Sequence, residues 1–238
     1  MNRFVILTVF AFLIIGDLAR ASTEVVVKDT EGMDAWVYLP TAEPKPGKSY
    51  WLVVGVHGLG GNGKGAMGLS PWAVDDVIVL GPSFVNGYQS GDGTNAEKLK
   101  ALITKIGGKW KLHPKILLHG FSAGAQFTHR FAIQNPDVVG VASAHSAGSW
   151  SPPTGPLPTV FFAVSCGETD TQKADPRMEL NRLEGLRAFA KALGEQKVPH
   201  EVKTWPGVGH SQCPQVIEMA KRAFETMRSA EKKAEPGR

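Results

Sequence analysis

The sequence lacks any block of basic residues: its formal net charge of +4 comes from Lys and Arg spread along the chain. Charge therefore gives no support for a nucleic-acid partner. The sequence also lacks an apolar run that could span a bilayer, because the run at residues 4–15 is short against the roughly 20 residues that a membrane helix needs. No internal repeat is present, which excludes the repeat architectures.

What the sequence does contain is typical of a globular protein with one sizeable core. Its 238 residues are 42% hydrophobic and 20% charged, a composition that fits neither a disordered chain nor a membrane bundle. The 27 glycines and 16 prolines indicate many tight turns. We expect a single domain over residues 22–238.

Residues 1–21 have the pattern of a secretory signal peptide. Arg3 precedes the apolar run, and Ala19 and Ala21 form the A-x-A arrangement that precedes a signal-peptidase site. We therefore expect the mature chain to begin at Ser22 and to be secreted or periplasmic, with no stable membrane insertion after cleavage. No cysteine stands in residues 16–22 directly after the run, so a lipid anchor would have no thiol to attach to there.

Strand and helix patterns alternate along the rest of the chain. Strands are predicted from β-rich or continuously apolar runs at 24–28, 35–39, 50–56, 77–81, 115–119, 138–144, 159–165 and 200–205. Helices are predicted from apolar periodicity at 94–106, 122–134, 178–193 and 214–228. This order predicts a doubly wound α/β fold, with a mostly parallel sheet, helices on both faces and an antiparallel N-terminal edge. Active groups in such sheets gather at the carboxyl ends of the strands.

The clearest sign of chemistry is the stretch LHGFSAGAQ at residues 118–126, which begins at the end of the predicted strand 115–119. Gly120, Ser122 and Gly124 fit the pattern G-x-S-x-G between a strand and a helix. The chain must reverse there within about two residues, which strains the serine backbone and pushes its hydroxyl outward, while the glycines remove Cβ atoms that would clash. The sequence therefore predicts Ser122 as a nucleophile.

Through this motif, and over nearly all of the predicted mature chain, the sequence resembles the α/β-hydrolase superfamily. A serine hydroxyl needs a base to become nucleophilic, and the resemblance implies the chain order serine, acid, histidine. His210, in the glycine-rich loop WPGVGHSQC after the last predicted strand, stands where the superfamily carries its base. His145, at the end of the strand at 138–144, is the alternative base and is otherwise expected to line the substrate pocket.

The acid of the triad should follow the predicted strand at 159–165, in the loop CGETDTQKADP. Asp170 is the leading candidate to orient the imidazole of His210 and to stabilise its charged form. Glu168 and Asp175 stay open as alternatives, although Asp175 belongs to an Asp-Pro pair of the kind that commonly opens a turn.

An oxyanion hole needs two backbone N–H donors. Ala123, directly after the predicted nucleophile, should supply one. In related enzymes a His-Gly pair precedes the other donor, which makes Leu59 the first choice and Gly58 the second. The flexible glycine-rich run at residues 60–65 does not predict a nucleotide site, because it lacks the spacing G-x-x-x-x-G-K-[ST].

The two cysteines stand near the predicted acid and base along the chain, Cys166 before Asp170 and Cys213 after His210. If the acid and the base hydrogen-bond, the two thiols lie in neighbouring loops, and the spacing permits a disulfide without requiring one. A bond at this place resembles the disulfide beside the active site of secreted, cutinase-like polyester hydrolases. The resemblance thus implies a Cys166–Cys213 disulfide, and the alternative is a free, buried Cys166.

The connection between the strands at 138–144 and 159–165 is too short for the helical lid that many lipases insert there. An open, lidless site suits soluble esters or an extended polymer. Trp150, within this connection, and Phe84, after the strand at 77–81, are expected to offer aromatic faces to the substrate. For Trp150 the alternative is packing over the prolines of its own loop.

The motif HGFSAGAQ and the downstream AHSAG resemble the small secreted esterases grouped with polyhydroxybutyrate depolymerases and feruloyl esterases. Dienelactone-hydrolase-like enzymes are near relatives but use a cysteine nucleophile. The resemblance implies a serine ester hydrolase that acts through an acyl-enzyme on short-chain, aromatic or polymeric esters, without cofactor or metal. One alternative is a serine peptidase, but such enzymes usually carry a propeller or cap domain, for which the expected mature chain has no space. The other is a catalytically silent binding module, which is disfavoured because all three triad positions are filled.

Overall fold

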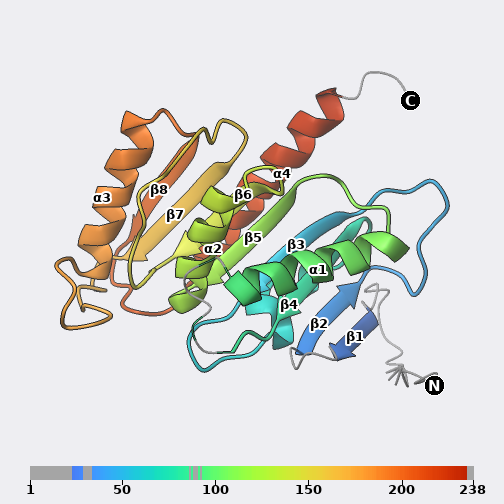
Figure 1. Cartoon of the computed structure of the whole chain (residues 1–238), viewed down its shortest axis with the longest axis horizontal. Coiled ribbons are helices and arrows are strands. Elements are labelled where there is room, and N and C mark those ends of the chain that lie inside the picture. Colours follow the sequence, from blue (N-terminus) through green and yellow to red (C-terminus); the bar gives the residue numbers. More distant parts are fainter. Residues whose placement is uncertain (1–22, 29–33, 86, 88–90, 92, 235–238) are drawn as a thin grey trace.

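A computed structural model describes residues 23–28, 34–85, 87, 91 and 93–234, so the predicted signal peptide lies outside the described residues. The strands are β1 (Thr23–Lys28), β2 (Asp34–Leu39), β3 (Trp51–Val56), β4 (Val77–Pro82), β5 (Ile116–Phe121), β6 (Val139–His145), β7 (Phe161–Gly167) and β8 (His200–Trp205). They form one sheet in the order β1-β2-β4-β3-β5-β6-β7-β8 (Figure 1). The β1–β2 and β2–β4 pairs are antiparallel, and the other neighbouring pairs are parallel. The predicted mostly parallel sheet with an antiparallel N-terminal edge is confirmed.

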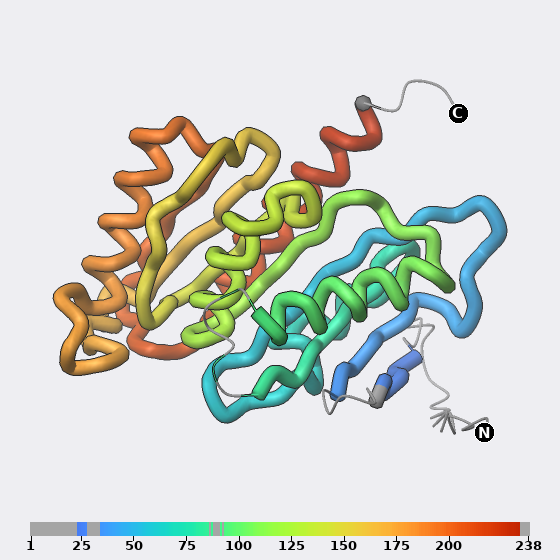
Figure 2. Tube along the Cα trace, in the orientation of Figure 1, coloured from blue at the N-terminus to red at the C-terminus, as the bar shows by residue number. Residues whose placement is uncertain are grey.

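Helices cover both faces of this sheet. The helices are α1 (Gly93–Lys109), α2 (Ala123–Gln134), α3 (Arg182–Glu195) and α4 (Pro214–Ala234), with the short 3-10 helices η1 (Lys64–Gly68) and η2 (Ser70–Trp72). Apolar residues of α1, α2 and α3 belong to one core cluster, and those of α4 and of the η1–η2 segment belong to a second. Figure 2 shows the blue strands β1 and β2 on one side of the molecule and the orange helix α3 on the other.

The strand β3 shows how the sequence builds the two cores. All of its residues are buried, as expected of a continuously apolar strand that is covered on both faces. Leu52 and Val54 belong to the cluster under α1 and α2, whereas Trp51 and Val53 belong to the cluster under α4. This alternation is the two-residue period of a strand.

The predicted helix ends differ most from the structure at the start of α3 and at the end of α4. Helix α3 begins at Arg182 and not at residue 178, because Asn181 caps it: the Asn181 side chain accepts from the Glu184 N–H at 2.9 Å, and the Glu184 carboxylate accepts from the Asn181 N–H at 2.9 Å. Helix α4 continues beyond residue 228 to Ala234.

The glycine-rich segment after β3 packs against the sheet as a backbone cover at Gly63 and Ala66. A Cβ atom at Gly63 would collide with the carbonyl group of Gly81 in β4, and one at Gly55 would collide with the carbonyl group of Ala66 in η1. The Gly63 N–H also donates to the Ser83 hydroxyl at 2.9 Å. The glycines are therefore needed for close approach between backbones.

Candidate active site

The residue Ser122 occupies a sharp turn at the carboxyl end of β5, immediately before α2. Its backbone has φ 57° and ψ −118°, which is a strained conformation for a residue with a side chain. The turn is held in place because the Ser122 N–H donates to the His145 carbonyl at 3.0 Å and its carbonyl accepts from the Gln126 N–H at 3.1 Å. The bend predicted from the motif is thus present.

The two motif glycines allow this turn to close. A Cβ atom at Gly120 would collide with the Gly124 backbone and would lie 2.6 Å from the Thr128 hydroxyl. A Cβ atom at Gly124 would collide with the carbonyl group of Val56 in β3 and lie 2.6 Å from that of His57. Both positions therefore accept only glycine without movement of the strand and helix backbones.

The three residues of the predicted triad lie in one hydrogen-bonded row at the carboxyl ends of their strands. The Ser122 hydroxyl donates to His210 Nε2 at 2.9 Å, and His210 Nδ1–H donates to Asp170 Oδ2 at 2.8 Å. The His210 side chain is 33% exposed, whereas that of Asp170 is 1% exposed. Such a row can pass a proton from the hydroxyl to an imidazole that a buried carboxylate orients.

The charge of Asp170 is favoured by its neighbours. Burial alone would raise the pKa of Asp170, but the hydrogen bond and charge of His210, a hydrogen bond from Ser146 and the charge of Arg182 together hold that pKa below its usual value. The Arg182 guanidinium lies 3.6 Å from Asp170 Oδ1. Neither Ser146 nor Arg182 is predicted from the sequence, because no motif connects either of them with the acid.

The two alternative acids are engaged elsewhere. Glu168 Oε1 accepts from the Thr204 hydroxyl at 2.9 Å. Asp175 forms an exposed ion pair with Arg177 at 2.6 Å. Among the three candidates, the hydrogen bond to His210 is made by Asp170.

The loops that carry the acid and the histidine are joined through their backbones. The Thr169 N–H donates to the Val208 carbonyl at 3.0 Å, and the Glu168 N–H donates to the Trp205 carbonyl at 3.0 Å. At Gly167 a Cβ atom would collide with the Val208 carbonyl, so the close contact between the loops requires glycine at the end of β7. The phenyl ring of Phe121 adds a ring contact to His210, with centroids 4.8 Å apart.

The backbone around the nucleophile supplies candidate oxyanion donors. Ala123 is the first residue of α2, where the backbone N–H has no partner within the helix. A Cβ atom at Gly58 would lie 3.7 Å from Ser122 Cβ, so the loop after β3 reaches the nucleophile, and the Leu59 side chain is 67% exposed. The His57 ring fixes this loop, because its Nδ1–H donates to the Gly58 carbonyl at 2.7 Å and its Nε2 accepts from the backbone N–H of residue 84 at 3.0 Å. The donor role of Leu59 stays a prediction.

Two residues expected to face the substrate are buried. His145 is 0% exposed, which corrects the prediction that it lines the pocket, because its ring points into the protein and bonds Ser165 and Ser211 at 2.9 and 3.0 Å. Phe84 is 6% exposed and packs on Phe127 with centroids 4.7 Å apart, so its side chain belongs to the core.

The indole of Trp150 lies between α2 and α3. Its ring stacks on Phe189 at a centroid distance of 4.9 Å and lies 5.0 Å from the ring of His129. A Cβ atom at Gly185 would lie 2.9 Å from Trp150 Cδ1, so a glycine in α3 makes room for the indole. Trp150 also lines a cavity of about 330 Å³ together with Met178 and Phe189. A role in substrate binding stays a prediction.

Both cysteines are free thiols, and the expected disulfide is absent from the structure. Cys166 is buried beneath the acid, where its sulfur lies 3.6 Å from the Ser146 hydroxyl and 3.8 Å from Asp170 Oδ2. Cys213 stands partly exposed just before α4. The contact between Asp170 and His210 therefore brings the loops together without joining their sulfur atoms.

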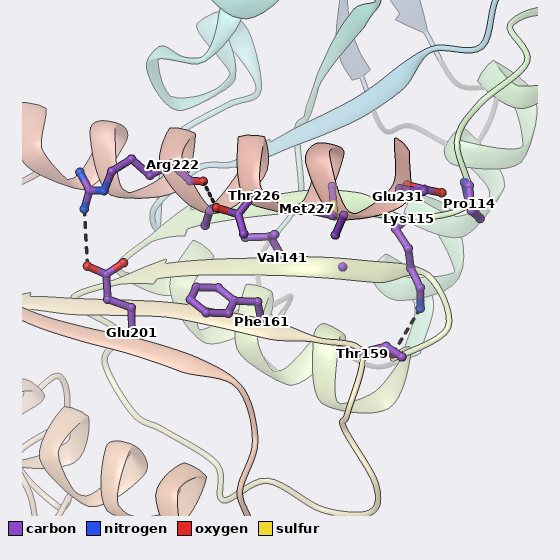
Figure 3. A pocket seen from close by; sticks show the side chains of 13 residues that line it. Pro114, Lys115, Val141, Thr159, Phe161, Glu201, Arg222, Thr226, Met227 and Glu231 are labelled. Carbon is purple, nitrogen blue, oxygen red and sulfur yellow. Dashed lines mark hydrogen bonds and ion pairs between the residues drawn. The ribbon is translucent and has the colours of Figure 1, made fainter. Parts of the chain in front are cut away.

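A cavity of about 680 Å³ lies at the opposite ends of the strands, between α4 and the beginnings of β6, β7 and β8 (Figure 3). The strands contribute Val141 and Phe161 to its lining and α4 contributes Met227, and at its rim Arg222 bonds Glu201 at 3.5 Å (Figure 3). No triad residue lines it.

Within the described part of the chain, no group of His, Cys, Asp and Glu side chains has the arrangement of a metal site. No helix in this part is long and apolar enough to cross a bilayer.

Neither a protein-family model nor a curated protein sequence matches the chain. Solved structures are similar to it: a thermostable esterase is 18% identical with a TM-score of 0.67, over 89% of this chain and 64% of that one. Poly(aspartic acid) hydrolase-1 from Sphingomonas sp. KT-1 is 17% identical with a TM-score of 0.62, over 88% and 99%. A ferulic acid esterase from Anaeromyces mucronatus is 14% identical with a TM-score of 0.62, over 85% and 88%. The chain thus spans less than two thirds of the thermostable esterase. The similarity to these structures shows that the chain has the α/β-hydrolase fold.

Proposed function

We propose that the protein is a serine hydrolase of carboxylic esters. The Ser122 oxygen attacks the ester carbonyl while His210 Nε2 takes the hydroxyl proton, and Asp170 stabilises the imidazolium that results. The protonated His210 then gives its proton to the leaving alcohol as the bond between the acyl carbon and the alcohol oxygen breaks. Water, deprotonated by His210, hydrolyses the acyl-enzyme and frees Ser122.

The observation that carries this proposal is the row of hydrogen bonds from Ser122 through His210 to Asp170, at 2.9 and 2.8 Å. The position of Ser122 directly before α2 is a second support. The free N–H groups at the start of a helix, together with the helix dipole, stabilise the negative charge of the reacting oxygen. We assign the oxyanion of the tetrahedral intermediate to the backbone N–H groups of Ala123 and Leu59.

For the substrate we propose short-chain, aromatic or polymeric esters. The connection from β6 to β7 supports this class, because it contains no helix or strand that could form a lid over the site. The names of two of the three similar structures, a thermostable esterase and a ferulic acid esterase, agree with an ester substrate. Hydrolysis of a peptide amide, and not of esters, would favour the alternative of a serine peptidase.

Replacement of Ser122 by alanine tests the nucleophile. We expect Ser122→Ala to lower kcat for p-nitrophenyl acetate by at least about 10³-fold, because the attacking oxygen is removed, with an unchanged circular dichroism spectrum. Ser229→Ala is the matched control, since Ser229 is an exposed serine of α4, and it should retain the parent activity. Parent-level turnover by Ser122→Ala would overturn the assignment of the nucleophile.

We also propose, from the pattern of residues 1–21 alone, that the protein is exported and cleaved. Mass spectrometry of the protein from its native host tests this point. A chain that begins at Ser22 supports export, and a chain that retains residues 1–21 in the cytoplasm contradicts it.

A further inference from the structure

Two buried histidines lie beneath the loop that carries His210, and the proposed reaction uses neither of them. His119 belongs to β5 and His145 ends β6. Both side chains are 0% exposed, so neither can meet a substrate. A buried imidazole is costly unless both ring nitrogens have partners, and the partners of these two rings include the residues that follow His210.

His119 holds the side chain of Gln212. The Gln212 amide donates to His119 Nε2 at 2.9 Å, which leaves the proton of the neutral ring on Nδ1, from where it is donated to the Ser143 hydroxyl at 2.9 Å. Burial, with the charge of His145 as a smaller cause, lowers the pKa of His119 to about 3. The ring therefore keeps its acceptor nitrogen at neutral pH.

His145 holds the backbone of Ser211. Its Nε2–H donates to the Ser211 carbonyl at 3.0 Å, and its Nδ1 accepts from the Ser165 hydroxyl at 2.9 Å. Burial is the largest influence on the pKa of His145 and lowers it. The two histidines thus use opposite tautomers, one accepting from the loop and the other donating to it.

These two bonds complete the attachment of the loop. On the side before His210, the Val208 carbonyl accepts from the Thr169 N–H at 3.0 Å, which ties the loop to the acid. On the side after His210, the bonds to Ser211 and Gln212 are long-range contacts to the buried strands β6 and β5. The imidazole is therefore fixed from both directions along the chain.

We infer that His119 and His145 are positioning residues, which hold Gln212 and Ser211 so that the His210 imidazole stays within hydrogen-bond reach of Ser122. This inference rests on the proposed function for its consequence in catalysis. Small displacements of a catalytic group lower rates steeply, by about 100-fold for a shift near 1 Å, so loosening the loop should lower turnover more than substrate binding.

The replacement Gln212→Met tests the anchor, because methionine keeps the length of the side chain and removes its amide. We expect kcat for p-nitrophenyl acetate to fall about tenfold or more, while KM changes by less than about threefold. Gln215→Met is the matched control, since Gln215 is an exposed glutamine in the first turn of α4, and it should retain the parent kcat. A kcat for Gln212→Met within twofold of the parent would overturn the inference.

Hydrogen exchange separates this inference from the proposed function. Amide exchange at residues 206–213, followed by mass spectrometry, should become faster in Gln212→Met and not in Gln215→Met, whether or not the protein hydrolyses esters. Combining His119→Phe with Gln212→Met should add little further loss, because both changes remove the same bond. Unchanged exchange in Gln212→Met would show that the bond between Gln212 and His119 does not anchor the loop, whereas a parent protein without esterase activity would reject only the proposed function.

Discussion

At the scale of single residues, the site depends on polar groups that are buried beneath the reacting atoms. Asp170 is almost fully buried, yet it carries the charge that orients His210, because Ser146 and Arg182 support that charge. Cys166 contributes a thiol to the same buried cluster. Buried polar groups therefore support the acid from below, while the side chain of His210 is 33% exposed.

The two cysteines give a prediction at this scale. Burial raises the pKa of Cys166 to about 11, and its interaction with Asp170 acts in the same direction, so its thiol stays protonated and unreactive at neutral pH. Cys213 is partly exposed. We expect a thiol reagent such as DTNB to label Cys213 in the folded protein and both cysteines after unfolding in urea.

Single replacements of the two cysteines show which thiol DTNB labels. Cys213→Ser should abolish the fast labelling, and Cys166→Ser should leave it intact. The prediction fails if the unfolded, unreduced protein offers no thiol at all, since that outcome would mean that the two sulfur atoms are bonded.

At the scale of secondary-structure elements, the nucleophile turn is possible because a strand and a helix approach each other through glycine. Gly124 faces the backbone of β3, so the first turn of α2 lies directly against that strand. We expect Gly124→Ala to lower the free energy of unfolding by about 2–3 kcal/mol, because the added methyl group must displace backbone atoms. Urea unfolding followed by circular dichroism measures this change.

Gly108 offers the matched control. It lies in α1, where a Cβ atom would meet no neighbour within 4 Å. Gly108→Ala should raise the free energy of unfolding by about 0.5–1 kcal/mol, because alanine favours the helix over glycine. Equal effects of the two replacements would contradict the account of the turn.

The sequence predicted the elements well wherever periodicity or continuous burial marked them. Continuous apolar residues predicted the strand β3. The motif around Ser122 predicted the strand β5, the turn and the helix α2 in the correct order. The sequence predicted the start of α3 less well, because the apolar spacing extends back past the Asn181 cap. It also missed the packing of the glycine-rich segment, since a run of glycines looks the same whether it moves freely or lies against another backbone.

The sequence predicted the positions of the triad residues better than the orientations of the side chains around them. Superfamily order placed Ser122, Asp170 and His210 in loops that the sheet topology brings together. It could not show that the side chains of His145 and Phe84 turn inward, because the end of a strand exposes one face and buries the other. Pairs such as His119 with Gln212 join residues far apart in the sequence, and no local pattern indicates them.

At the scale of the whole molecule, buried histidines make folding depend on pH. Burial is the main cause that lowers the pKa of His119 and of His129 to about 3 in the folded protein, whereas histidines of an unfolded chain titrate near 6.5. Between these values the unfolded chain binds protons that the folded chain does not. The free energy of unfolding should therefore decrease as the pH falls below about 6.5, by up to about 1.4 kcal/mol per pH unit for each such histidine.

Urea unfolding at pH 7.0, 6.0 and 5.0 measures this dependence. The contribution of Asp170 to stability does not change between pH 7 and pH 5. A carboxyl group with a lowered pKa loses its stabilising effect only when the pH falls below its usual value near 3.8. An unfolding free energy that stays constant from pH 7 to pH 5 would contradict the neutral, buried state of these rings.

The backbone cover formed by residues 58–68 limits how this enzyme candidate can be redesigned. Gly63 meets the backbone of β4 at Gly81 without an intervening side chain, and Gly60, Gly65 and Gly68 have positive φ values that disfavour any residue with a Cβ atom, so replacements at these positions would be strained. Selectivity is better altered in the segments 152–158 and 171–180, most of whose residues are exposed. A search for new specificities should diversify those two segments and leave the glycines unchanged.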